Sequence, residues 1–246
     1  MSRIEGKIAL VTGANRGIGR AFVEELLAAG IDKVYATARN PETLKDLVAL
    51  GQGRVVPFAL DVTNPKNIKD AAELDTNISV LINNAGIASF EGLIDAKNID
   101  RAREEMETNY FGVLNMTRSF APVLGANGGG TIVNIASIAA HVNFPILGSY
   151  SASKAAVHSL VQGVRAELAS QGTLVVGVYP GPVDTSMSEK LPMDKASPKD
   201  VVRAILKGVE AGEEEIYPDP ASLELHLGLL SDPNAVQKQV AEMLPE

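Results

Sequence analysis

The stretch Ile8-Ala9-Leu10-Val11-Thr12-Gly13-Ala14-Asn15-Arg16-Gly17-Ile18-Gly19 begins as a short apolar run and continues into a loop with three glycines. The apolar run predicts a buried strand, and the residues from Gly17 to Ala29 predict a helix that ends at Gly30. Glycines between a strand and a helix N-terminus let the backbone approach a pyrophosphate closely. A tight turn without a ligand would use the same glycines, so this motif alone leaves two interpretations open. The loop lacks the Gly-Lys-Ser/Thr sequence of a P-loop, which excludes that class.

Apolar, β-branched runs alternate with amphipathic stretches along the rest of the chain. The further predicted strands are 34–37, 55–60, 79–82, 131–135, 174–179 and 215–217. Further helices are expected from about 40 and about 64, over 98–124, 150–170 and 199–211, and as two short pieces within about 220–246. Strands this apolar, separated by helices, are typical of a parallel sheet covered on both faces. No linker or repeat interrupts the pattern, so we expect an α/β fold and a single domain over residues 1–246.

The composition excludes several classes of function. A net charge of -8 argues against a nucleic-acid or anionic-membrane partner, which would need a basic surface. The chain has no cysteine and three scattered histidines, so we expect no disulfide, no thiol nucleophile and no metal. Apolar runs are too short for a signal-peptide core or a membrane span. We therefore expect a cytoplasmic protein.

A second motif, Tyr150-Ser151-Ala152-Ser153-Lys154, places a phenol and an ammonium one helical turn apart. A phenol has a reference pKa of about 10 and exchanges protons poorly at neutral pH. A cation about 4 Å away, at an effective dielectric constant near 20, would favour the phenolate by up to ~4 kcal/mol. This spacing also occurs by chance, so its value depends on the setting.

That setting resembles the short-chain dehydrogenase/reductase family, in its compact branch of about 250 residues. The resemblance covers nearly the whole chain and follows the family's motif order. Besides the glycine loop and the Tyr150/Lys154 pair, it rests on Asp61-Val62, Asn83-Asn84-Ala85-Gly86, Asn109-Tyr110-Phe111-Gly112, Ser137, Pro180-Gly181 and Thr185. It implies a doubly wound, Rossmann-like fold with a mostly parallel seven-stranded sheet and helices on both faces.

The resemblance also implies a dinucleotide site. Asp61 and Val62 would lie near the adenine, Asn84, Ala85 and Gly86 near the adenosine ribose, and Pro180, Gly181, Val183 and Thr185 near the nicotinamide carboxamide. The glycine-loop residues assigned to the cofactor are Gly13, Asn15, Arg16, Gly17, Ile18 and Gly19. For Asn83 to Gly86, a plain turn after a buried strand stays an alternative.

The catalytic roles follow from the same resemblance. Ser137 would bind the substrate oxygen, and Tyr150 would act as general acid or base while hydride moves. Lys154 would hold the nicotinamide ribose, and Asn109 would brace a proton-relay water, unless it is only a polar residue that kinks the helix. A hydrolase with Ser137 as nucleophile is excluded because the flanking residues lack the glycines of a nucleophile elbow.

The cofactor is expected to be NADP(H). An NAD site usually has an acidic residue at the end of the second strand, and here Ala36-Thr37-Ala38-Arg39 has none. Arg39 and Arg16 could bind a 2′-phosphate through charge-assisted hydrogen bonds. Two ordinary surface arginines are the alternative.

The substrate is expected to be a small ketone, aldehyde or secondary alcohol. A short loop over about 183–198, where the family builds its substrate lid, presents apolar side chains including Met187. Ser89, Phe90, Val142 and Phe144 are expected in the same pocket. A homodimer or homotetramer packed through the helices around Asn109 and His158 is expected as well.

Two other functions stay open at this stage. A non-catalytic NADP(H)-binding sensor could keep the glycine loop, but it would not need Ser137, Tyr150 and Lys154 together. A sugar-nucleotide epimerase or dehydratase uses a related fold, but it normally has a larger C-terminal substrate domain than the residues after Pro180 provide.

Overall fold

A parallel sheet forms the centre of the protein. The computed structural model describes residues 2–189 and 191–244. The strands are β1 (Ile8–Val11), β2 (Lys33–Ala38), β3 (Val55–Ala59), β4 (Val80–Asn83), β5 (Thr131–Ile135), β6 (Leu174–Val178) and β7 (Glu215–Ile216). They pair in the order β3-β2-β1-β4-β5-β6-β7, and every pairing is parallel. The expectation of a doubly wound, Rossmann-like sheet is confirmed.

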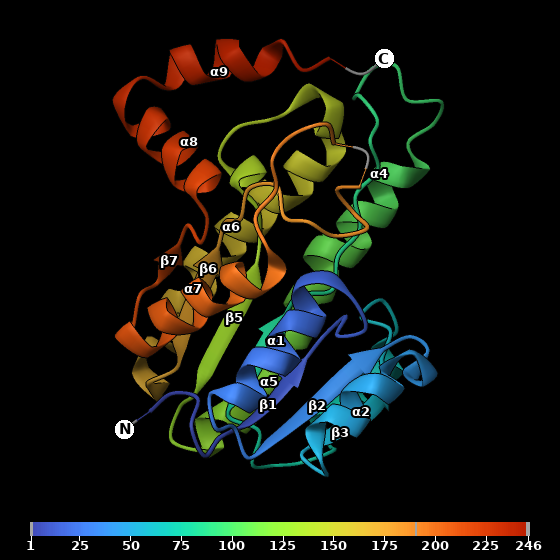
Figure 1. Cartoon of the computed structure of the whole chain (residues 1–246), viewed down its shortest axis with the longest axis vertical. Helices are drawn as coiled ribbons and strands as arrows, with labels where there is room; N and C mark the ends of the chain where they lie inside the picture. Colours follow the sequence, from blue (N-terminus) through green and yellow to red (C-terminus); the bar gives the residue numbers. More distant parts are fainter. Residues whose placement is uncertain (1, 190, 245–246) are drawn as a thin grey trace.

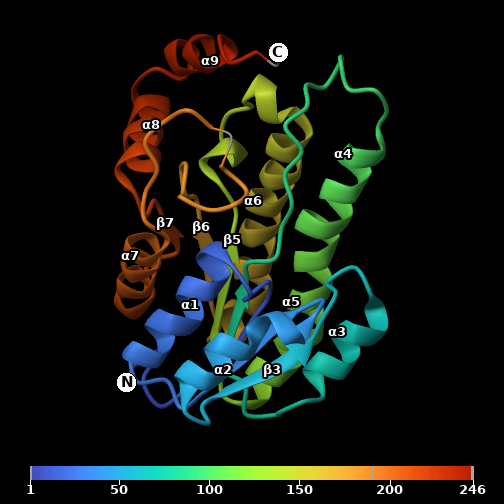
Figure 2. The same ribbon diagram turned by 45° about the vertical axis from the view of Figure 1, so that its right-hand side comes forward.

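Helices cover both faces of this sheet (Figure 1). They are α1 (Gly17–Ala28), α2 (Lys45–Gly51), α3 (Pro65–Ala72), α4 (Asp100–Glu105), α5 (Gly112–Ala126), α6 (Gly148–Leu168), α7 (Pro198–Ala211), α8 (Pro220–Ser231) and α9 (Pro233–Ala241). Helices α1, α2 and α7 pack on one face, and α3, α5 and α6 pack on the other. The last two helices, α8 and α9, lie at one end of the molecule, near the C-terminus (Figure 2).

Alternation along the strands explains this layering. Successive side chains of a strand point to opposite faces of the sheet. In β1, Ala9 and Val11 join the core under α1 and α7, whereas Leu10 joins the core under α5 and α6. Because both faces are buried, the strand is apolar throughout, which is the pattern by which the sequence predicts it.

The site is determined by the strand order. From β1 the chain moves outward to β2 and β3, then returns to the other side of β1 and continues from β4 to β7. The connections therefore diverge between β1 and β4 at the carboxyl ends of the strands, which is where open α/β sheets bind ligands. Residues after Val11 and Asn83 consequently face each other across this opening.

The long helical stretch predicted over 98–124 is not one regular α-helix. Between α4 and α5 the chain forms a π-helical segment, Met106–Phe111, and Asn109 lies within it. Helix α6 begins at Gly148, two residues before the predicted start, and a 3-10 turn, Ala169–Gln171, follows it. Within residues 2–189 and 191–244, none of the helices combines the length and the apolar character needed to cross a bilayer.

Candidate active site

The glycine loop is held to the end of β4 by polar contacts. The Thr12 hydroxyl accepts hydrogen bonds from the backbone N–H groups of Asn84 (2.9 Å) and Ala85 (3.0 Å). The Asn84 side chain donates to the carbonyl oxygens of Thr12 (2.9 Å) and Gly13 (3.1 Å). Two predicted motifs, one after β1 and one after β4, therefore form a single backbone unit.

Glycine is required in this unit for two different reasons. Gly13 and Gly17 have φ angles of +65° and +52°, in the left-handed region where side chains are strained. Gly19 has no positive φ, but a Cβ atom there would lie 2.2 Å from the Gly13 carbonyl oxygen. The first two glycines shape the turn, and the third lets α1 pack closely on it.

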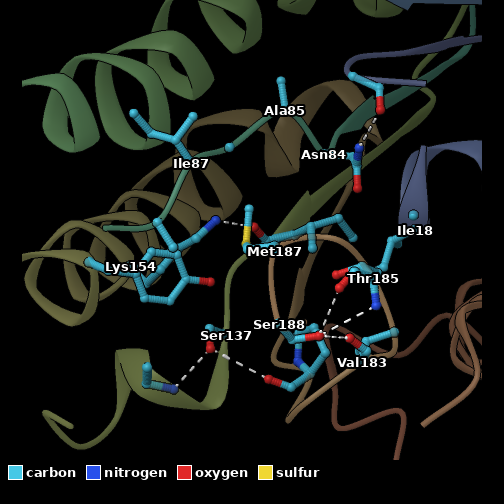
Figure 3. A pocket seen from close by; sticks show the side chains of 18 of the residues that line it. Ile18, Asn84, Ala85, Ile87, Ser137, Lys154, Val183, Thr185, Met187 and Ser188 are labelled. Carbon is cyan, nitrogen blue, oxygen red and sulfur yellow. Dashed lines mark hydrogen bonds between the residues drawn. The ribbon is translucent and has the colours of Figure 1, made fainter. Parts of the chain in front are cut away.

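This unit forms one wall of a cleft of about 790 Å³, whose other walls come from β5, α6 and the loop after β6. Figure 3 shows Lys154 and Ser137 on one side of the cleft and Ile18 and Thr185 on the other. The predicted site residues that line the cleft are Gly13, Asn15, Arg16, Gly17, Ile18, Arg39, Asp61, Val62, Asn84, Ala85, Gly86, Phe90, Ser137, Phe144, Tyr150, Lys154, Pro180, Gly181, Val183, Thr185 and Met187. Gly19 lies behind the loop, and Asn109 lies behind the wall formed by Gly86 and Ile87.

Two cations lie beside the glycine loop in the cleft. Arg16 and Arg39 are both exposed and both line it, and neither forms an ion pair with any residue described in the structure. Asp61 faces the same cleft, and its carboxylate accepts hydrogen bonds from the backbone N–H (2.9 Å) and hydroxyl (2.7 Å) of Thr63. The two arginines are thus available to a phosphate, and the glycine cradle fits a pyrophosphate.

Ser137, Tyr150 and Lys154 come together at the centre of the cleft. Ser137 follows β5, whereas Tyr150 and Lys154 lie on the first turns of α6. The Lys154 ammonium is 5.6 Å from the centre of the Tyr150 ring and donates to the Ile135 carbonyl oxygen at 2.8 Å. The three side chains can therefore meet one ligand.

The expected lowering of the phenol pKa by Lys154 is wrong for the protein by itself. The pKa of Tyr150 is raised to about 12, chiefly by burial and to a smaller extent by the charge of Glu105, while the hydrogen bond with the Ser137 hydroxyl opposes the increase. Burial also lowers the pKa of Lys154 to about 8. Removing both side chains from water disfavours their charged forms, and here this effect is larger than the attraction between them.

Asn109 connects two parts of the site. Its amide nitrogen donates to the Ile87 carbonyl oxygen and to the Ser153 hydroxyl, both at 2.9 Å. Its amide oxygen accepts from the Ile87 backbone N–H at 2.9 Å. The residue is fully buried, and a π-helical turn is a common feature of functional sites. The side chain fixes the strand-like segment after β4 to α6.

Two residues expected in the substrate pocket lie elsewhere. Ser89 turns its hydroxyl to Glu105, at 2.7 Å, instead of to the cleft. Val142 packs with Val236 and Val240 of α9. In both cases the side chain contacts a residue that is distant in the sequence, and the local sequence does not predict that contact.

Other residues of the cleft were missed by sequence reasoning. Ile146, Leu225 and Met243 line its outer part, and the Ile146 backbone N–H donates to the Met243 carbonyl oxygen at 3.1 Å. The C-terminal segment thus returns to cover the mouth of the cleft. Leu191 and Met193, by contrast, belong to the apolar side chains expected from the lid loop over 183–198, and they line the same region.

The three histidines form a separate cluster with two tyrosines. His158 and the Tyr179 hydroxyl are 2.7 Å apart, Tyr217 reaches His141 at 3.2 Å, and Tyr217 stacks on His226. His141 is therefore part of a packed cluster. Among the described residues, no group of His, Asp or Glu side chains could hold a metal ion.

The fold and this cleft define a class: an α/β protein that binds a nucleotide at the carboxyl ends of a parallel sheet. Residues 7–196 match the family model for short chain dehydrogenase. The chain is 39% identical over 198 residues to an L-2,3-butanediol dehydrogenase of Corynebacterium glutamicum, which covers 75% of each chain. It is 30% identical over 249 residues to an NADP-dependent 3-hydroxy acid dehydrogenase of Schizosaccharomyces pombe, which covers 93% of this chain and 96% of that one.

A solved structure gives the same assignment. A short chain dehydrogenase from Burkholderia cenocepacia J2315, in complex with NADP, superposes with a TM-score of 0.92 at 43% identity. The match covers 97% of this chain and 98% of that one. The chain belongs to the short-chain dehydrogenase/reductase family.

Proposed function

We propose that the protein reduces a ketone or an aldehyde to an alcohol with NADPH, reversibly, with Tyr150 as general acid and base. As a family member it is an NADP-dependent oxidoreductase acting on CH–OH or C=O groups. The observation that carries the finer proposal is the meeting of Ser137, Tyr150 and Lys154 on one wall of the cleft. A site that only bound the nucleotide would not need all three.

The residues of the chain account for the proton side of the reaction. Bound NADPH supplies a hydride to the carbonyl carbon, and the oxygen becomes an alkoxide. Ser137 donates a hydrogen bond to that oxygen, and the Tyr150 hydroxyl transfers its proton to it, which gives the alcohol. In the reverse direction the Tyr150 phenolate removes the hydroxyl proton. General acid–base catalysis of this kind contributes about 10²- to 10⁴-fold in rate.

The raised pKa of Tyr150, about 12, suits the reducing direction, because the phenol keeps its proton at neutral pH. Oxidation needs the phenolate, which a neighbouring cation favours. Lys154, with a pKa of about 8, is mostly charged at neutral pH and supplies that cation. We therefore expect oxidation of an alcohol to become faster as the pH rises from neutral towards about 8, above which Lys154 loses the charge that favours the phenolate.

The 2′-phosphate of the cofactor is assigned to Arg16 and Arg39. Both are exposed at the adenosine end of the cleft and without an ion-pair partner among the described residues. Hydrogen bonds to charged groups contribute about 1.5–3 kcal/mol, so one such contact gives roughly a 10- to 100-fold preference for NADPH over NADH.

The substrate is proposed to be uncharged and largely apolar. Around Ser137 and Tyr150, the outer cleft is lined mainly by apolar side chains: Phe90, Phe144, Ile146, Leu147, Met187, Leu191, Met193, Leu225 and Met243. Two acidic side chains, Glu104 and Glu107, also line the cleft and would repel an anionic substrate. An apolar pocket with a few convergent polar groups is the usual form of a small-molecule site.

A homodimer or homotetramer is proposed through α5 and α6. These helices expose a shallow groove on the side away from the sheet, lined by Tyr110, Leu114, Ala156, Ser159, Leu160, Gly163, Val164 and Glu167. Small and apolar side chains of this kind let helices from two subunits pack closely. Light scattering on wild type and on Leu160→Glu would test it, and a monomeric wild type would contradict it.

NADPH oxidation at 340 nm, measured against an aliphatic ketone, an aromatic ketone, an α-diketone and an aldehyde, tests the catalytic proposal. Tyr150→Phe should remove turnover while NADPH still binds, as judged by its fluorescence. Tyr110→Phe is the matched control, because Tyr110 lines the α5–α6 groove and not the cleft. An active Tyr150→Phe variant would contradict the assigned role.

The same measurements separate the other two functions. A sensor would bind NADPH and oxidise none with any compound. An epimerase or dehydratase would convert a sugar nucleotide without net consumption of NADPH.

A further inference from the structure

Asn109 joins three elements around Lys154. From the π-helical segment its side chain reaches back to Ile87, in the segment after β4, and across to Ser153 on α6. Ser153 directly precedes Lys154. One buried side chain thus fixes the distance between the segment that follows β4 and the turn of α6 that carries the lysine.

Glu105 repeats this construction one helical turn earlier. Its carboxylate is 1% exposed. One oxygen accepts from the backbone N–H (2.6 Å) and the hydroxyl (2.7 Å) of Ser89, in the segment after β4. The other accepts from the Ser149 hydroxyl on α6 at 2.5 Å. Ser149 directly precedes Tyr150, as Ser153 precedes Lys154.

The spacing of the two connections is regular on all three elements. The bridging residues are four apart on the α4 and π-helical stretch, and their partners on α6 are also four apart, so each set shares one helix face. Their partners after β4, Ile87 and Ser89, are two apart in the segment without regular secondary structure that follows β4. Helices α4 and α6 lie side by side in Figure 2.

We propose that Glu105 is a positioning residue for Tyr150: through Ser149 it fixes the turn of α6 that carries the phenol, and it places a buried carboxylate in contact with the residue that directly precedes Tyr150. This rests on the proposed function, because it assumes that Tyr150 transfers the proton. Charge-assisted hydrogen bonds to a carboxylate are short and about twice as strong as neutral ones.

The charge of Glu105 is held without a cation. It forms no ion pair with any described residue, and its hydrogen bonds to Ser89 and Ser149 replace the lost water. A neutral glutamine of the same shape could still accept from Ser89 through its amide oxygen, but its amide nitrogen would have to donate to the Ser149 hydroxyl. A buried carboxylate beside the phenol disfavours phenolate formation and raises the pKa of Tyr150.

Other charged groups lie on α6 and on the elements packed against it. They are Lys154, His158, Arg165 and Glu167 on α6 itself, Asp100, Arg101, Arg103 and Glu104 on α4, Glu107 in the π-helical segment, Arg118 on α5, and His141 after β5. Of these elements, α4 supplies the charge that acts on the phenol, through Glu105. Asp100, Arg101, Arg103 and Glu104 are exposed and screened by water.

Two substitutions separate position from charge. Ser149→Ala removes the contact beside Tyr150 and leaves the carboxylate, whereas Glu105→Gln removes the charge and keeps a side chain of the same shape. Ser149→Thr keeps the hydroxyl and should rescue the alanine variant. Asp100→Asn is the matched control, since it removes one exposed negative charge from the same helix.

The rate constants should respond differently to the two changes. Ser149→Ala should lower kcat for reduction about 10- to 100-fold with little change in the Kd of NADPH, because misplacement of a reacting group by about 1 Å has that effect. Glu105→Gln should move the alkaline limb of reduction and the acid limb of oxidation to lower pH. Asp100→Asn should move neither.

Any of three results in these assays would overturn the proposal: a kcat of Ser149→Ala within about twofold of wild type, a pH profile of Glu105→Gln that coincides with wild type, or equal losses of kcat and of NADPH binding. Failure of the proposed function is distinguishable, since wild type itself would then oxidise no NADPH. Amide hydrogen exchange needs no substrate. It should be faster over 148–154 in Ser149→Ala than in wild type and unchanged over α1, and unchanged exchange over 148–154 would also overturn the proposal.

Discussion

The two halves of the cleft are built in different ways. The cofactor half uses backbone: the loop after β1 and the segment after β4 are joined by the Thr12 hydroxyl and the Asn84 amide, and glycines let them approach. The two strands involved are neighbours in the sheet. The geometry of the cofactor half therefore does not depend on surface side chains.

The substrate half uses side chains brought from distant parts of the chain. Phe90 follows β4, Phe144 follows β5, Met187 follows β6, and Met243 is close to the C-terminus. Most of these residues lie on loops, and Met187 and Met243 are 37% exposed. Loops tolerate substitution better than a strand-to-helix turn does. Substitutions in the substrate half can therefore change which substrate is bound while the cofactor half still binds the same cofactor.

The largest effect is expected from a methyl group in the cofactor half. Gly19→Ala would place Cβ 2.2 Å from the Gly13 carbonyl oxygen and 2.5 Å from the Asn84 amide nitrogen. We expect a loss of about 3 kcal/mol in the free energy of unfolding and an NADPH Kd raised by at least about 100-fold.

Urea unfolding and NADPH fluorescence measure the two quantities. Gly163→Ala is the control for NADPH binding alone, because Gly163 lies in the α5–α6 groove, outside the cleft lining, and no described atom would lie within 4 Å of its Cβ. If Gly19→Ala bound NADPH as wild type does, the backbone account of the cofactor half would be wrong.

A smaller effect is expected at the two free arginines. Arg39→Ala should lower the ratio of kcat/KM with NADPH to kcat/KM with NADH by about 10- to 100-fold, through loss of a charge-assisted contact. The value with NADH should hardly change. Exposed Arg118→Ala, on α5, is the control. An unchanged ratio in the double variant Arg16→Ala/Arg39→Ala would remove the phosphate assignment.

In the substrate half, Met243→Ala should raise KM for an apolar ketone about 3- to 10-fold, because part of one apolar contact contributes about 1 kcal/mol. The Kd of NADPH should stay the same, which separates the halves. Leu230→Ala is the control, since Leu230 is an exposed apolar residue of α8 outside the cleft lining. Equal changes in both constants would mean that the halves are not independent.

The smallest effect is expected from acid. Burial, with repulsion from His158 and His226, lowers the pKa of His141 to about 4, below its usual value near 6.5. The folded protein therefore favours the neutral His141 ring. The free energy of unfolding is unaffected by this residue above about pH 6.5, and it decreases as the pH falls towards 4.

Thermal unfolding between pH 7 and pH 4 tests this effect. Tm should fall less in His141→Gln than in wild type, and amides of β6 and β7 should exchange faster at pH 4.5 before those of β1 and β2 do. Identical pH dependence of Tm in the two proteins would show that protonation of His141 does not lower the stability of the protein.

The same contrast explains how much could be predicted from sequence. The sheet, its parallel pairing and the glycine loop follow from apolar runs and local turn chemistry, which act within a few residues. Ser137, Tyr150 and Lys154 were placed by motif order, and the cleft contains them. Their roles, and the organisation as a single domain, stay predictions.

What the sequence did not give depends on partners far apart in the chain. Val142 packs against α9, and the Ser89 hydroxyl donates to Glu105, so neither side chain lines the cleft. The pKa of the Tyr150 phenol is raised instead of lowered, because the effect of burial is larger than that of the nearby ammonium. The π-helical turn at Asn109 has no periodicity that a pattern of apolar residues can reveal. Such features require the whole fold to be known.

The position of β1 between β2 and β4 has a consequence for synthesis of the chain. Ala9 pairs with Val34 on one side and with Val80 on the other. As the chain leaves the ribosome, β1, β2 and β3 can assemble early, but one edge of β1 keeps its hydrogen-bonding groups unpaired until β4 has emerged. An apolar edge of this kind is prone to pair with other chains. Nascent chains that end between residues 60 and 80 should therefore be the form that chaperones bind most strongly.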